Sequence, residues 1–205
     1  MKQIKVYYIF FHFITSLALT ISFLINENFK VKILYYLFSM ALTNLLVHIS
    51  IKDIGNKLVE KKLTLLAGII SILYLIFKNY DYIYINNYLP IAVDISNAIY
   101  IVIVFTLLRL FAKKFIGIEI IGIADIKLFG IAYLYLGELG GQVALIIAFI
   151  SAAFFSFSGR ISGYLKKYER IAFCPFITLG ICGVLNMGPI WWVKQWNGLW
   201  GSIVR

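Results

Sequence analysis

Two acidic residues, Asp53 and Asp125, stand out because each lies in or beside a strongly apolar stretch of the chain. Asp53 follows a hydrophobic run, and Asp125 lies inside another, within GIADIKLFG at residues 122–130. An ionised carboxylate is costly in the hydrocarbon core of a membrane, so both side chains need a partner. We expect the two carboxylates to meet at one depth.

Two carboxylates in contact near a low-dielectric region cannot both ionise easily, and they tend to share one proton. This is the condition for aspartic protease chemistry. One carboxylate acts as a general base on water, while its protonated neighbour donates to the oxygen of the scissile carbonyl. The alternative is that each aspartate only caps a helix or pairs with a nearby lysine. Lys127 is poorly placed to neutralise Asp125, because residues two apart point to nearly opposite sides of a helix.

The composition shows what kind of elements must position these residues. Hydrophobic residues make up 62% of the 205-residue chain and charged residues only 14%, which excludes an ordinary soluble domain. We therefore predict an all-α, polytopic membrane helix bundle of about six or seven transmembrane helices, forming one domain over residues 1–205. The expected spans are residues 6–26, 33–51, 63–77, 91–111, 117–137, 142–158 and 173–190. Residues 191–205 are expected to form an interfacial aromatic tail.

The formal charge of +10 is explained by the distribution of basic residues among the loops. With seven spans, 14 of the 19 lysine and arginine residues fall on one side of the membrane. The positive-inside rule makes this the cytoplasmic side, with the amino terminus inside and the carboxyl terminus outside. We therefore predict a multi-pass protein of a cell membrane, in contact with lipids and with no nucleic-acid partner.

Other polar residues in the apolar segments are assigned minor roles. Asp94 is expected nearer the outer face, where it could tune the aspartate pair or bond to a neighbouring helix, and Glu119 is expected to be interfacial. Gly122, three residues before Asp125, would share its helical face and remove bulk there. No grouping of histidine with acidic residues has the spacing of a metal site, so neither a metal nor another cofactor is predicted.

Three segments resemble type IV prepilin peptidases, a family of membrane aspartic peptidases. DIGNKLVEKKLT, residues 53–64, is similar to the first catalytic segment, and GIADIKLFG is similar to the second, Gly-x-Gly-Asp-x-Lys. RIAFCPFITLG, residues 170–180, resembles a third segment near the end of the family domain. The matches occur in the family order and cover about residues 45–190. The resemblance implies that Asp53 and Asp125 are catalytic, and that the enzyme removes the leader of pilin-like precursors at the cytoplasmic membrane face.

The chain departs from the family pattern at several positions near the expected site. Ala124 replaces the second glycine of the Gly-x-Gly-Asp pattern, and Glu60 replaces a proline. In the third segment, Ala172 and Cys174 replace a proline and a glycine. Glu60 would either bind a basic leader or lie solvated beside Lys57 and Lys61. The resemblance leads us to expect that five residues shape the site or contact the substrate: Gly122, Ala124, Lys127, Glu60 and Pro175.

The cysteine content limits the activities to be expected. Bifunctional family members carry paired Cys-x-x-Cys motifs, whereas this chain has only Cys174 and Cys182, which cannot form a four-cysteine zinc site. We predict packing roles for both cysteines, without a disulfide, and peptidase activity without N-methyltransferase activity. Two other functions stay open: a proton-coupled transporter, since buried carboxylates also mark ion pathways, and a weakly active or inactive family member acting as an assembly partner.

Overall fold

The computed structural model describes residues 29–56, 59–85, 87–115, 117, 121–163 and 171–194. Within these residues the chain forms helices and their connections and no strand, so the predicted all-α fold is confirmed for this part. The main elements are α2 (Phe29–Asn56), α3 (Lys61–Lys78), α4 (Tyr80–Tyr84), α5 (Leu89–Phe115), α6 (Ile123–Ile161) and α7 (Cys174–Met187). The predicted span at residues 6–26 and the tail beyond residue 194 lie outside the described residues.

Three helices in the described part of the chain are long and apolar enough to cross a membrane: Leu34–Gly55 of α2, the whole of α5, and α6. The spans predicted at 63–77 and 173–190 correspond to α3 and α7, which have 18 and 14 residues. Side chains along α5 are mostly exposed, including Ile103 and Leu107, as expected for a helix that faces lipid. The protein is therefore an integral membrane protein.

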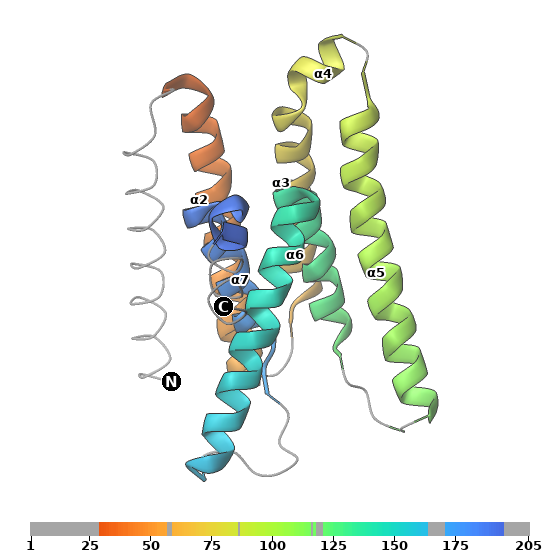
Figure 1. Cartoon of the computed structure of the whole chain (residues 1–205), viewed down its shortest axis with the longest axis vertical. Helices are drawn as coiled ribbons and strands as arrows, with labels where there is room; N and C mark the ends of the chain where they lie inside the picture. Colours follow the sequence, from red (N-terminus) through yellow and green to blue (C-terminus); the bar gives the residue numbers. More distant parts are fainter. Residues whose placement is uncertain are drawn as a thin grey trace, which may run out of the picture.

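Helix α6 reverses direction at Gly137 (Figure 1). This residue has φ 74° and ψ −177°, a conformation that is nearly restricted to glycine. We call residues 123–136 the first arm of α6 and residues 138–161 the second arm. The arms correspond to the separate spans predicted at 117–137 and 142–158, although the first arm begins six residues later than predicted.

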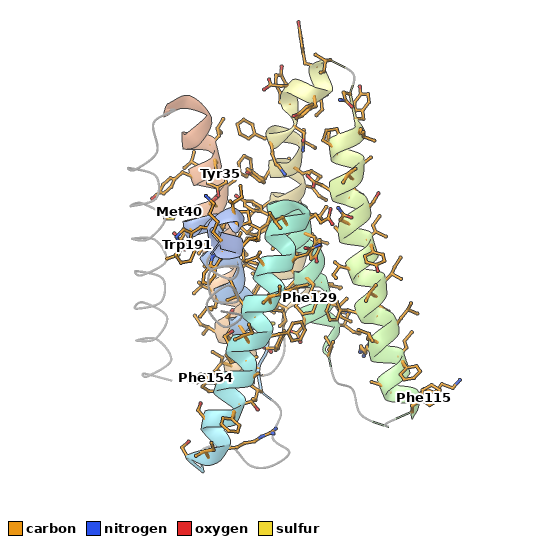
Figure 2. All side chains as sticks on the ribbon, viewed as in Figure 1. Tyr35, Met40, Phe115, Phe129, Phe154 and Trp191 are labelled. Atoms are coloured by element: carbon orange, nitrogen blue, oxygen red, sulfur yellow. The ribbon has the colours of Figure 1, made fainter. Side chains whose placement is uncertain are left out.

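The core forms where α2, α7 and both arms of α6 pack together. Leu46, Phe129 and Ile181 are fully buried there. Figure 2 shows Phe129 inside the bundle, while Phe115 and Phe154 project from its periphery. Gly180 allows the closest approach between α7 and the second arm, because a Cβ atom at this position would lie 2.1 Å from the Ala144 carbonyl oxygen.

Several helix ends that carry basic residues gather toward one end of the bundle. Figure 1 shows the ends of α2 and α5 and the starts of α3, α6 and α7 toward the lower part of the view. These ends bring Lys52, Lys61 and Lys113 to the same side, whereas Lys78 lies at the opposite end of α3. The fold therefore agrees with the predicted charge asymmetry, and the orientation relative to the cytoplasm stays a prediction.

Candidate active site

Three helix ends bring together two carboxylates and a thiol. Asp53 lies in the last turn of α2, Asp125 in the first turn of α6, and Cys174 is the first residue of α7. One carboxylate oxygen of each aspartate and Cys174 Sγ all lie within 4.8 Å of one another. The structure thus places the two aspartates together, although 71 residues lie between them in the sequence.

The start of α6 fixes Asp125 in place. Gly122 is the N-cap residue of this helix, and its backbone N–H donates a hydrogen bond of 3.3 Å to Asp125 Oδ2. Such a bond satisfies one of the amide groups that a helix start leaves free. The expectation that Gly122 shares a helical face with Asp125 is wrong, because Gly122 is extended (φ −72°, ψ 151°) and precedes the helix. Asp125 therefore caps the start of a helix, as the alternative interpretation of the sequence proposed. It also belongs to the cluster with Asp53 and Cys174.

Asp53 lies at the amino-terminal end of α7. The residue is only 9% exposed, and its Oδ2 accepts a hydrogen bond of 3.3 Å from the backbone N–H of Cys174. Amides in the first turn of a helix have no intrahelical acceptor, and the helix dipole favours a negative charge there. Pro175 occupies the first turn of α7, where the missing N–H of proline costs nothing. Pro175 therefore helps to start the helix that presents the Cys174 amide.

Cys174 contacts both members of the aspartate pair. Besides its amide bond to Asp53, its Sγ donates a hydrogen bond of 3.1 Å to Asp125 Oδ1, and the residue is fully buried. The sequence interpretation treated Cys174 as a packing residue and missed this contact. The signal available was the Cys-Pro pair, because proline near a helix start indicates free amides that attract an anion. Cys182 is also buried, and the two cysteines do not form a disulfide.

A buried pair of hydroxyl groups joins α2 to α7 one turn away from the aspartates. Ser50 Oγ lies 2.7 Å from Thr178 Oγ1, and Ser50 Oγ also donates to the carbonyl oxygen of Leu46 at 2.8 Å. Ser50 is three residues before Asp53, and Thr178 is four residues after Cys174, so the pair lies on the same faces as the site. These bonds fix the register between the two helices that carry Asp53 and Cys174.

Within the described part of the chain, three other predicted site residues form no hydrogen bond or ion pair with the aspartates. Ala124 is half-buried, and Lys127 is exposed and forms no ion pair with Asp125. Glu60 pairs with Lys52, at the surface. This ion pair lowers the pKa of Glu60. The prediction named Lys57 and Lys61 as neighbours of Glu60 and did not name Lys52; residue 57 lies outside the described residues.

The remaining acidic residues of the apolar segments lie elsewhere. Asp94 forms an ion pair of 3.2 Å with Lys78, at the end of α3 opposite to Glu60 and next to the reversal at Gly137. Asp94 is thus bonded to a neighbouring helix. Glu119 lies outside the described residues.

The cluster has two possible chemical uses. The close carboxylates can exchange a proton with a water molecule, as in general acid–base catalysis. Two carboxylates and a thiolate are also ligand types that zinc accepts, so the same atoms could hold a metal ion, which the sequence spacing did not indicate. The chain matches no protein-family model, no curated protein and no solved structure. The function must therefore be inferred from the site and from the motifs of the sequence.

Proposed function

We propose that this protein is a membrane aspartic endopeptidase similar to type IV prepilin peptidases. The observation that carries the proposal is the close approach of Asp53 and Asp125, whose carboxylate oxygens lie within 4.8 Å of each other. Each aspartate comes from a segment that resembles one of the catalytic segments of that family. Cys174 and Pro175, which begin α7 beside the aspartates, belong to the third similar segment.

The aspartate pair would act on a peptide bond through one water molecule. The ionised carboxylate takes a proton from the water molecule while the water oxygen attacks the carbonyl carbon. At the same time the protonated carboxyl group donates its proton to the carbonyl oxygen. When the tetrahedral intermediate collapses, the carboxyl group formed in the first step gives its proton to the leaving amine, and the other carboxylate takes a proton from a hydroxyl group of the intermediate. The pair then again holds one proton.

The surroundings of the site favour a substrate that is itself anchored in the membrane. The aspartates lie at helix ends near the basic end of the bundle, which is predicted to face the cytoplasm. A pilin-like precursor has an apolar stem that can pack among the helices and a leader junction at the membrane surface. Docking of the stem would hold the junction at the aspartates and reduce the entropic cost of the reaction. No N-methyltransferase activity is proposed.

The test is cleavage of candidate precursors by the full-length protein in liposomes, with sequencing of the new amino termini. Asp53→Asn and Asp125→Asn should each lower the cleavage rate by at least about 100-fold, the contribution typical of an acid–base group. Asp94→Asn is the matched control, because Asp94 pairs with Lys78 at the other end of α3. All three variants should insert into the membrane as the wild type does. If Asp53→Asn and Asp125→Asn both cut at the wild-type rate, the assignment is wrong.

A further inference from the structure

Cys174 is the residue through which α7 holds both aspartates. Its backbone N–H donates to Asp53 Oδ2 and its thiol donates to Asp125 Oδ1, at 3.3 Å and 3.1 Å. The thiol is fully buried, so solvent does not compete for these hydrogen bonds. One residue therefore links the end of α2 to the start of α6.

We propose that Cys174 is a positioning residue for the aspartate pair, and that its thiol holds Asp125 in the orientation needed for general acid–base catalysis. The effect on catalysis rests on the proposed peptidase function. The contact between the thiol and Asp125 does not depend on that function, and it can be measured without a substrate.

The geometry separates the two contributions of Cys174. The backbone N–H is present with any residue except proline, so a side-chain substitution leaves the bond to Asp53 in place. It removes the thiol donor to Asp125 Oδ1. Serine keeps a donor on the same Cβ atom, whereas alanine removes it. The comparison of these two variants therefore separates the effect of losing the hydrogen bond from the effect of replacing the cysteine side chain.

The start of α7 is held rigidly enough for such a role. Ser50 and Thr178 fix α7 against α2 one turn further along, through a buried contact of 2.7 Å. Thr178 Oγ1 also donates to the Leu46 carbonyl oxygen at 3.3 Å. A donor on a fixed helix end can restrict the rotation of a carboxylate, which is the requirement for a supporting residue.

The first experiment measures the contact itself by infrared spectroscopy. The chain contains two cysteines, so Cys182→Ala leaves Cys174 as the only source of an S–H stretching band. In this background the band should lie at the lower frequency of a hydrogen-bonded thiol, and Asp125→Ala should move it to higher frequency. A band that stays in place when Asp125 is replaced would overturn the proposal, whether or not the protein cuts any precursor.

The second experiment measures cleavage in liposomes as a function of pH. Cys174→Ala should lower kcat about tenfold with little change in KM, because a weak donor to the carboxylate is lost and the peptide-binding surface is kept. The acidic limb of the kcat profile should move to higher pH, since the ionised carboxylate loses a stabilising bond. Cys174→Ser should restore both quantities in large part. Cys182→Ala, on the same helix, should change neither.

The outcomes separate this proposal from the proposed function. If Cys174→Ala keeps the wild-type kcat and pH profile, Cys174 has no positioning role. If alanine and serine lower kcat equally and the profile does not move, the role is only structural and the proposal is wrong. If the wild-type protein cuts no precursor, the peptidase proposal fails, and the S–H band alone decides whether Cys174 holds Asp125.

Discussion

The two oxygens of Asp125 accept hydrogen bonds from different parts of the fold. Gly122, at the start of the same helix, donates to Oδ2, and Cys174, at the start of α7, donates to Oδ1. A carboxylate held at both oxygens cannot rotate freely, so little entropy is lost when it engages a reacting group. Asp53 is held by one of the same residues, through the Cys174 amide. The two side chains are therefore oriented together.

Glu60, at the surface near the site, could serve only as the partner of Lys52 in an ion pair, or it could contact the substrate. We predict that Glu60→Gln leaves both the thermal unfolding temperature and the cleavage rate of a basic-leader precursor unchanged, because an exposed pair with Lys52 contributes little. The pKa of Glu60 is lowered, so any contribution of the pair to stability is present above the usual pKa of glutamate and is lost as the pH falls through the lowered value. We expect that loss to be too small to measure.

The measurement for Glu60 compares wild type and variant in liposomes, with thermal unfolding over a range of acidic pH. Lys52→Gln is the matched control, because it removes the same pair from the other side. A rise in KM with Glu60→Gln but not with Lys52→Gln would contradict the prediction and make Glu60 a leader-binding residue.

At the scale of elements, the reversal of α6 depends on one glycine. We predict that Gly137→Ala destabilises the protein by about 1 to 3 kcal/mol, because its backbone conformation is strained for any residue with a Cβ atom. Space is not the cause, since the nearest atoms, Asp94 Oδ1 and Lys78 Nζ, would lie 3.4 and 3.5 Å from the new Cβ. Thermal unfolding in detergent measures the change.

Gly68→Ala provides the control for the reversal. Gly68 is a helical residue of α3, and an added Cβ would meet no atom within 4 Å apart from its chain neighbours and the backbone of its own helix, so alanine should be neutral or stabilising there, by up to about 1 kcal/mol. If Gly137→Ala and Gly68→Ala unfold at the same temperature, the strain attributed to Gly137 is absent.

The sequence was sufficient to predict elements but not the details of their ends. Hydropathy separated the two arms of α6, because apolar runs on either side of residues 138–141 are long enough to be distinct. It did not place the start of the first arm, since residues 117–121 are mostly apolar, whereas the extended backbone of Gly122 makes the helix begin only at Ile123. The contact of Cys174 with the aspartates depends on how α7 packs against α2 and α6, which periodicity within one helix does not specify.

At the scale of the whole molecule, the fold places the aspartate pair at one end and a second group of charges at the other. Asp53 and Asp125 meet near helix ends rich in lysine and arginine, whereas Lys78 and Asp94 pair at the opposite end of α3. A long apolar surface on α5 and the second arm of α6 lies between the two ends. This arrangement suits an enzyme that cuts at one membrane surface, provided that the aspartate end faces the cytoplasm.

That orientation can be tested by labelling single introduced cysteines in whole cells with a membrane-impermeant maleimide. Lys61 begins α3 near the aspartate end, and Tyr84, which is 80% exposed, ends α4 at the other end. The positive-inside rule predicts that Tyr84→Cys is labelled from outside, and that Lys61→Cys is labelled only after the membrane is opened. The native cysteines are buried and should give little background. The reverse pattern would place Asp53 and Asp125 at the outer surface, where a cytoplasmic leader could not reach them before export.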